Sequence, residues 1–281
     1  MKNPRWLLNF KYNVFSQNGE DGIIEKILDI IPDKNKFCVE FGAWDGVFLS
    51  NTRNLILNRG YSAVLIEADK EKFKELKNNY IYNPSVITLN KFVGFNNNDN
   101  LDIILKDVSI PVDFDFLSID VDGNDYHIWN AIQYYKPKLV CIEYNPTIPV
   151  EIDFVQPADY SINQGCSLLS LVRLGKAKGY ELISTCFVNA FFVKKEYFSL
   201  FDITDNSPEA LQTHSDFITY IFWGYDGTIF LRGFKKSIWH HGLELDETKI
   251  QLLPPDLRKY PECYTNEEKE LYQRWLEKTK K

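Results

Sequence analysis

The middle of the sequence alternates short apolar segments with segments of helical spacing, and this alternation limits the fold more than any other feature. Five apolar segments of strand length lie at 36–42, 61–69, 85–94, 114–125 and 137–146, and a helical segment follows each of the first four. Strands that are apolar on both faces and joined through helices form parallel sheets with helices on both sides. We therefore expect a doubly wound α/β fold.

The pattern changes after Pro146. A proline-rich loop spans 147–165, and it is followed by a helical segment and by two strand-like segments, YELISTC at 180–186 and NAFFVKKEYF at 189–198. These two segments are close enough in sequence to pair as a hairpin at the edge of the sheet. The sequence therefore predicts a mostly parallel, seven-stranded, Rossmann-like sheet with one antiparallel strand.

The chain is expected to divide at residue 198. Residues 1–198 should form the α/β domain with an N-terminal helical cap, and residues 199–281 an aromatic-rich C-terminal extension. The end of this extension, NEEKELYQRWLEKTKK, places two aromatic and two leucine side chains on one helical stripe, which predicts that the extension docks on the core. Its aromatic residues are also candidates for a homodimer contact.

Composition argues against several classes of protein. The net charge is −7 and no cluster of lysine or arginine stands out, so a nucleic-acid partner is not expected. The sequence has no apolar run of about 20 residues, so we expect no membrane span, and its first residues lack the apolar run of a signal peptide. The five cysteines form no CxxC pair, which is typical of reduced cysteines in a cytoplasmic protein.

A turn with two glycines, in the sequence VEFGAWDG, follows the first expected strand. Such a turn at the carboxyl end of a parallel strand is typical of a nucleotide-like ligand. The dinucleotide fingerprint requires a glycine two residues after Gly42, and this chain has Trp44 there. Glu40 and Asp45 would also repel a pyrophosphate, whereas they would attract the sulfonium and ammonium groups of S-adenosylmethionine. The residue types favour S-adenosylmethionine over NAD as the cofactor.

Acidic and polar residues near the ends of the first two strands are candidates for further cofactor contacts. Glu67 ends the second strand, where an acidic residue can accept hydrogen bonds from ribose hydroxyl groups. The alternative is that Glu67 and Asp69 cap the following helix. Asn51 and Thr52 follow the glycine turn, and they could contact the amino-acid end of the cofactor or cap the next helix.

Carboxylates are densest at the end of the fourth strand, in the sequence SIDVDGNDYHIW. Asp120, Asp122 and Asp125 would repel one another unless a cation, a hydroxyl donor or solvent compensates them. The alternative is a turn in which these side chains bond their own backbone. The fifth strand ends in IEYNP, which adds Glu143 and Asn145. The set of Asp120, Glu143 and Asn145 has the oxygen donors that Mg²⁺ prefers, so it is a candidate magnesium site.

Methyl transfer from a cofactor such as S-adenosylmethionine requires alignment of the acceptor and, if the acceptor is a hydroxyl group, removal of a proton. A base, or a metal ion that lowers the pKa of the hydroxyl group, is therefore expected in the site. Asp120, Glu143 and His127 are the candidate catalytic residues. The alternative for His127 is a histidine on the surface of the helix that it begins.

Five motifs occur in the order FSQNGEDG, VEFGAWDG, LIEAD, SIDVDGND and IEYNP. Together they resemble the FkbM-type branch of class I S-adenosylmethionine-dependent methyltransferases, from about residue 15 to residue 198. That branch commonly shows the pattern D-x-E-G-x-E where this chain has DVDGND, so Asp122 and Asp125 stand in place of glutamates and are one methylene shorter. The resemblance implies methylation of an oxygen, often on a sugar, in glycan, capsule or natural-product biosynthesis.

The resemblance also implies that the FSQNGEDG segment lies over the cofactor. The loop at 147–165 follows the fifth strand, and we expect it to lie above the acceptor and to shape the choice of acceptor. The expected cofactor-binding residues are Gln17, Glu40, Gly42, Asp45, Gly46, Asn51, Thr52, Glu67, Ala68 and Asp120. The expected contacts to the acceptor are Asp122, Asp125, Asn145 and Tyr160.

Other functions stay open from the sequence alone. The acceptor could be an amine or a phosphorylated small molecule in place of a sugar hydroxyl. A chain of this architecture could also be an NAD-dependent sugar-modifying enzyme, although the spacing of the glycines disfavours it. A non-catalytic binding module is the third alternative, and the number of carboxylates at the ends of the strands argues against it.

Overall fold

The computed structural model describes residues 3–240 and 242–279, and the chain divides into two compact units. The first unit is Met1–His214 and the second is Ser215–Lys281. The segment 199–214, which we assigned to the extension, is therefore part of the first unit. Its Leu211 is buried in the same hydrophobic cluster as residues of the sheet.

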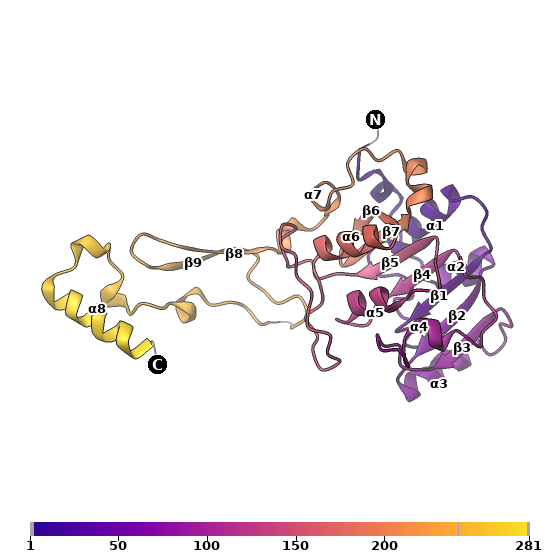
Figure 1. Cartoon of the computed structure of the whole chain (residues 1–281), viewed down its shortest axis with the longest axis horizontal. Coiled ribbons are helices and arrows are strands. Elements are labelled where there is room, and N and C mark those ends of the chain that lie inside the picture. Colours follow the sequence, from indigo (N-terminus) through magenta and orange to yellow (C-terminus); the bar gives the residue numbers. More distant parts are fainter. Residues whose placement is uncertain (1–2, 241, 280–281) are drawn as a thin grey trace. The chain divides into compact units, whose positions relative to one another are not determined.

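The first unit contains one seven-stranded sheet with the strand order β3-β2-β1-β4-β5-β7-β6 (Figure 1). Strands β1 to β5 are parallel, and β7 is antiparallel to both of its neighbours. The expected doubly wound sheet and its edge hairpin, β6 with β7, are confirmed. The strands are β1 Phe37–Phe41, β2 Ser62–Glu67, β3 Val86–Asn90, β4 Phe116–Ile119, β5 Leu139–Glu143, β6 Tyr180–Cys186 and β7 Asn189–Lys194.

Helices cover both faces of this sheet, because alternate strand residues are buried on opposite sides. One hydrophobic cluster joins the sheet to α1, α2 and α3, and the other joins it to α4, α5 and α6. The helices of the first unit are α1 Glu20–Ile30, α2 Arg53–Arg59, α3 Lys70–Asn79, α4 Leu101–Ile104, α5 Asp125–Ala131, α6 Leu168–Ala177 and α7 Pro208–Leu211, with 3₁₀ turns at Trp6–Phe10 and Lys195–Phe201.

A buried ion pair joins three segments at the amino-terminal edge of the sheet. Lys138, just before β5, lies with its Nζ 2.7 Å from Oδ1 of Asp115, which precedes β4, and both side chains are almost fully buried. Asp115 also accepts hydrogen bonds from the backbone N–H groups of Asn35 and Lys36, before β1. The pair therefore anchors the starts of β1, β4 and β5 to one another.

The second unit contains a two-stranded antiparallel hairpin, β8 Thr219–Trp223 with β9 Ile229–Gly233, and a helix, α8 Asn266–Thr279. The helix predicted at the end of the chain is thus confirmed over its described residues. Its docking on the core stays a prediction. Short 3₁₀ turns lie at Ser215–Phe217, Glu247–Ile250, Pro255–Leu257 and Pro261–Cys263. Among the described residues, no helix has both the length and the apolar character needed to cross a bilayer.

Candidate functional site

The glycine turn lies where the strand order reverses, between β1 and β4, which is where ligands bind in open parallel sheets. Gly42 has a φ of +70°, and a Cβ atom at this position would lie 2.1 Å from the backbone oxygen of Asp120. No side chain fits there. The backbone N–H of Trp44 then donates to Glu67 Oε2 at 2.8 Å. The turn therefore bridges the carboxyl ends of β1, β2 and β4.

The second half of the turn is held by its own side chains. Asp45 Oδ1 accepts hydrogen bonds from the backbone N–H groups of Val47 and Phe48. Gly46 has a φ of +71°, and a Cβ atom there would overlap the ring of Tyr80. Asp45, which we expected at the cofactor, is therefore engaged in closing the turn, and its contact with a cofactor stays a prediction.

Glu40 organises the segment that precedes α2. Its carboxylate accepts hydrogen bonds from Ser50 Oγ at 2.7 Å, from Thr52 Oγ1 at 2.6 Å and from the backbone N–H of Asn51 at 2.9 Å. Burial raises the pKa of Glu40, although these hydrogen bonds act in the opposite direction. Glu40, Asn51 and Thr52 are all buried. They support the glycine turn from inside the protein, and their contacts with a cofactor stay predictions.

Glu67 and Asp69, at the end of β2, have different roles. The side chain of Asp69 accepts hydrogen bonds from two N–H groups in the first turn of α3, so Asp69 caps this helix. Glu67 is not the cap, because its carboxylate accepts from the backbone N–H groups of Trp44 and Asp69. Ala68 is exposed, and its carbonyl oxygen accepts from Asn90. Glu67 thus lies beside the glycine turn. The contacts of Glu67 and Ala68 with a cofactor stay predictions.

The FSQNGEDG segment lies close to the same edge of the sheet. Negative charge on Glu20, after the larger effects of burial and nearer carboxylates, contributes to a raised pKa of Asp120. Two buried polar atoms of the segment, Asp21 Oδ1 and Asn18 Nδ2, have no hydrogen-bond partner among the described residues. Such atoms are normally completed by a ligand or by ordered water. Gln17 is exposed, and its contact with a cofactor stays a prediction.

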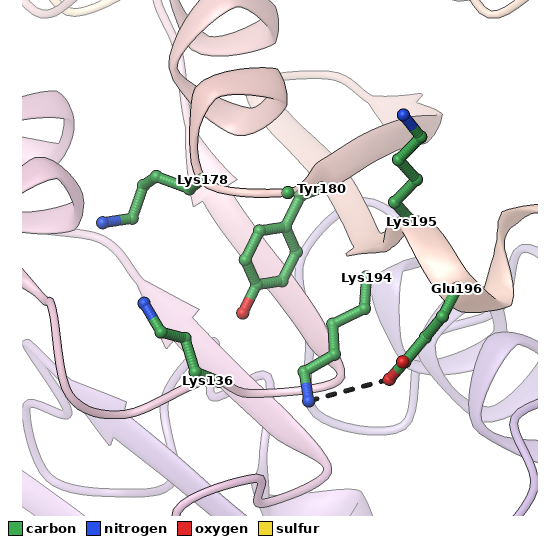
Figure 2. A pocket seen from close by; sticks show the side chains of 7 residues that line it. Lys136, Lys178, Tyr180, Lys194, Lys195 and Glu196 are labelled. Atoms are coloured by element: carbon green, nitrogen blue, oxygen red, sulfur yellow. Dashed lines mark ion pairs between the residues drawn. The ribbon is translucent and has the colours of Figure 1, made fainter.

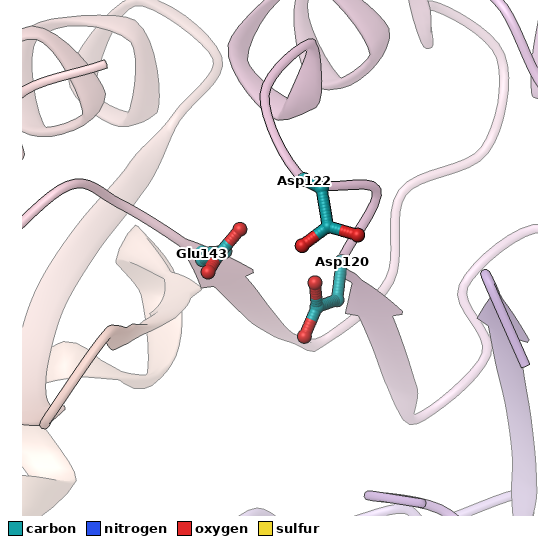
Figure 3. Close-up of side chains that lie close together, drawn as sticks. All are labelled: Asp120, Asp122 and Glu143. Carbon is teal, nitrogen blue, oxygen red and sulfur yellow. The ribbon is translucent and has the colours of Figure 1, made fainter. Parts of the chain in front are cut away.

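Three carboxylates meet where β4 and β5 end. Asp120 directly follows β4, Glu143 is the last residue of β5, and Asp122 lies in the turn after β4 with a φ of +56°. Figure 3 shows the three side chains turned toward one another. Each offers one oxygen, and these oxygens all lie within 4.8 Å of one another. Asp120 and Asp122 are exposed to solvent, and Glu143 is half-buried.

Two of the three carboxylates, Asp120 and Glu143, have strongly raised pKa values. Although Asp120 is exposed by its surface area, the protein packed around its carboxyl group removes much of the hydration of that group. This desolvation, followed by the charges of Asp125 and Asp122, raises the pKa of Asp120 to about 8. Burial and the charge of Asp120 also raise the pKa of Glu143 well above its ordinary value. In the described part of the chain, no lysine, arginine or histidine forms an ion pair with any of the three. The cluster is therefore short of positive charge, and a cationic ligand would be favoured there.

Asp125 and Asn145, two of the expected acceptor contacts, are used by the backbone around them. Asp125 accepts hydrogen bonds from the N–H groups of Val121 and Gly123, so the turn interpretation holds for this residue. Asn145 Oδ1 accepts from both the backbone N–H and the hydroxyl group of Thr147. Since that oxygen is occupied, the geometry points to Asp122, in place of Asn145, as the third oxygen donor beside Asp120 and Glu143.

His127 anchors a loop. Its Nε2 lies 2.8 Å from the backbone oxygen of Gln156. A carbonyl oxygen only accepts hydrogen bonds, so Nε2 carries the proton and cannot take one from an acceptor. The ring also lies 5.5 Å from the ring of Phe95. This contact favours a structural role for His127 over the role of a base.

Gln156 is the residue that sequence reasoning missed. Its buried side chain accepts from the N–H groups of Gln164 and Gly165 and donates to the carbonyl of Ile162, which closes the loop on itself. Asn163 then donates to the backbone oxygen of Asp122 at 2.7 Å. A single glutamine in a proline-rich loop gives no sequence signal, because its partners are set by the path of the loop.

Tyr160 joins this loop to the segment after β3. Its ring stacks on that of Phe95 at 4.3 Å between centroids. Its hydroxyl group donates to Asp99 and accepts from the N–H of Phe95 and the side chain of Asn96. The loop at 147–165 is therefore fixed to the turn at Asp122 through Asn163 and to the 92–100 segment through Tyr160.

No protein-family model matches the sequence, and no curated protein matches it at a significant level. The N-terminal domain of EvdMO1 with SAH bound is similar in structure, with a TM-score of 0.41, 11% identity, and coverage of 64% of this chain and 82% of that chain. A SAM dependent methyltransferase from Aquifex aeolicus has a TM-score of 0.36 and 10% identity, and the match covers 69% of this chain and 97% of that chain. The glycopeptide N-methyltransferase MtfA complexed with sinefungin has a TM-score of 0.37 and 10% identity, and the match covers 65% of this chain and 90% of that chain.

The strand order and the antiparallel β7 define the fold class. A seven-stranded sheet in the order β3-β2-β1-β4-β5-β7-β6, with helices on both faces, is the Rossmann-like fold of class I S-adenosylmethionine-dependent methyltransferases. The fold predicted from the sequence is thus confirmed. The narrower resemblance to the FkbM-type branch stays a prediction.

Proposed function

We propose that this chain is an S-adenosylmethionine-dependent methyltransferase that methylates a hydroxyl group of a sugar or of another small molecule. One observation carries the proposal: three carboxylates, which form no ion pair with any described lysine, arginine or histidine, meet at the carboxyl edge of the sheet, beside the turn at Gly42. A sulfonium and an ammonium group would relieve their repulsion, whereas the pyrophosphate of NAD would increase it. The same charges make an acidic acceptor unfavourable.

The residues around the turn suit a positively charged nucleoside. Gly42 leaves the end of β1 free of a side chain, and Glu67 lies beside it with carboxylate oxygens that can accept further hydrogen bonds. When bound, S-adenosylmethionine supplies a methyl group on a positively charged sulfur. The protein's own part is to hold that group in line with the acceptor oxygen and to keep both in place.

Asp120 is the proposed base. Its carboxylate is exposed at the carboxyl edge of the sheet, where an acceptor can reach it, and Glu143 lies beside it. A pKa near neutrality suits a group that takes up a proton during the reaction. The charges of Asp125 and Asp122 raise the pKa of Asp120, which helps it to hold the proton that it receives.

The same three carboxylates fit a divalent cation. Asp120, Asp122 and Glu143 offer the all-oxygen donor set that Mg²⁺ binds, usually together with water. When bound, Mg²⁺ would lower the pKa of the acceptor hydroxyl group. A chelator distinguishes a base that acts without metal from a metal-dependent site. If Asp120 acts as a base without metal, the purified protein should keep its turnover in the chelator. If a metal is needed, the chelator should abolish turnover and added Mg²⁺ should restore it.

Cofactor binding is tested by calorimetric titration of the full chain with S-adenosylhomocysteine and, separately, with NAD. We expect binding of the first and none of the second. Glu67→Ala removes the partner of the Trp44 and Asp69 N–H groups, so it should weaken binding about tenfold or more.

Glu71→Ala is the matched control, because Glu71 lies on the exposed face of α3 and forms only a surface ion pair with Lys74. It should bind S-adenosylhomocysteine as the unaltered chain does. Binding of NAD without binding of S-adenosylhomocysteine would overturn the proposal. A methylation screen over nucleotide-linked and phosphorylated sugars, with and without Mg²⁺, then addresses the acceptor.

Tyr160 provides a test of the loop. Tyr160→Phe keeps the stacking on Phe95 but removes the hydroxyl group that joins the loop to Asp99. We expect the KM for the acceptor to rise several-fold, by about the loss of one hydrogen bond, with unchanged affinity for S-adenosylhomocysteine. Tyr82→Phe, at a fully exposed site, is the control. An unchanged KM for Tyr160→Phe would show that the loop does not help to bind the acceptor.

A further inference from the structure

A second site lies at the opposite edge of the sheet. A pocket of about 330 Å³ is lined by four lysines, one glutamate and the start of β6: Lys136, Lys178, Gly179, Tyr180, Lys194, Lys195 and Glu196 (Figure 2). Lys136 precedes β5, and Lys194 ends β7, which runs antiparallel to β5. The pocket is therefore at the amino-terminal end of β5, whereas Glu143 is at the other end of this strand, about 13 Å from its first residue.

The positive charge in the pocket is largely uncompensated. Lys194 Nζ lies 3.8 Å from Glu196 Oε1, which is an ion pair but too long for a hydrogen bond. Within the described residues, no carboxylate lies at ion-pair distance from Lys136, Lys178 or Lys195. Four positive side chains and one negative one give the lining a formal charge of +3, in a chain whose net charge is −7.

The fold holds Lys178 in place near Lys136. The amino group of Lys178 donates to the carbonyl oxygen of Ile132, at the end of α5, which fixes its position. Burial and the positive charge of Lys136 lower the pKa of Lys178 to about 8. Figure 2 shows Lys136 and Lys178 on one side of the Tyr180 ring and Lys194 on the other. Positive groups that repel one another in a concave site favour an anion between them.

We propose that this pocket binds a small ligand that carries phosphate groups, at a site separate from the proposed methyl-transfer site. A phosphate offers several oxygens that can accept from ammonium groups on different sides, which fits lysines arranged around a ring. The volume is at the small end of the range for ligand sites. The negative charge of the rest of the chain disfavours a long polyanion such as nucleic acid.

Inorganic pyrophosphate is the probe, titrated calorimetrically into the full chain. We expect saturable binding that weakens as NaCl is raised, because the attraction is electrostatic. The double variant Lys136→Gln/Lys194→Gln should weaken binding about tenfold or more, since it removes two charged donors. Lys106→Gln/Lys176→Gln makes the same change in net charge at exposed positions outside the pocket, and it should bind as the unaltered chain does.

Further arms identify the ligand and separate the two proposals. Thermal melting of both double variants checks that they remain folded. Titration with S-adenosylhomocysteine should give the same affinity in the pocket variant as in the unaltered chain. The pyrophosphate titration does not depend on that result, so it still tests the pocket if the methyltransferase proposal fails. Absence of pyrophosphate binding, or equal weakening in both double variants, would overturn the site. Binding to vesicles of an anionic phospholipid without binding to pyrophosphate would overturn it as well.

Discussion

Asp120→Asn is expected to lower kcat at least about 100-fold, which is the lower range for loss of a general base. Asparagine has nearly the same shape but cannot take up the proton of the acceptor. Affinity for S-adenosylhomocysteine should change little, because the backbone of residue 120, which Gly42 packs against, is unaltered. The measurement is a methylation assay under saturating cofactor, paired with calorimetry.

Asp107→Asn serves as the control for Asp120→Asn, because it makes the same chemical change at an exposed position after α4. Its kcat should equal that of the unaltered chain. Normal turnover by Asp120→Asn would remove Asp120 from the mechanism. If Mg²⁺ is required, Glu143→Gln should show a loss of similar size, since Glu143 offers an oxygen to the same cluster.

Lys138→Met is expected to lower the free energy of unfolding by about 3 kcal/mol or more. The substitution leaves the carboxylate of Asp115 buried without its lysine, while methionine keeps much of the volume. A loss of this size corresponds to a melting temperature lower by about 6–12 °C in a domain of this size. Urea unfolding and thermal melting of the full chain would measure it.

Lys106→Met is the control for Lys138→Met, because Lys106 is exposed and its loss should change stability by less than about 0.5 kcal/mol. Equal stability of the Lys138→Met variant and the unaltered chain would mean that the desolvation free energy of the buried pair offsets its electrostatic attraction. That result would place the anchoring of β1, β4 and β5 in their apolar contacts instead.

The fold was predictable because its signal is periodic. Five apolar strands separated by helices leave few arrangements other than a parallel sheet, and YELISTC and NAFFVKKEYF are too close for any connection but a hairpin. The gathering of Asp120 and Glu143 was predictable for the same reason, since the carboxyl ends of adjacent parallel strands share one edge. Both predictions need only the order of the elements.

The directions of individual side chains were not predictable in this way. Asn145 turns to Thr147, and His127 turns to a carbonyl 29 residues further along the chain. These choices depend on the path of a loop that has no periodic signal. Glu40 is similar: its burial against Ser50 and Thr52 follows from how the chain returns after the glycine turn.

The close approach of Gly42 to the carbonyl of Asp120 couples the position of the glycine turn to that of the proposed base. The backbone of Gly42 lies directly against the backbone oxygen of Asp120, with no side chain between them. The turn therefore cannot shift toward β4 without displacing residue 120. Entry of the methyl donor into the turn would thereby set the position of the proton acceptor. An ordered sequence, donor first and acceptor second, is the kinetic behaviour that this contact favours.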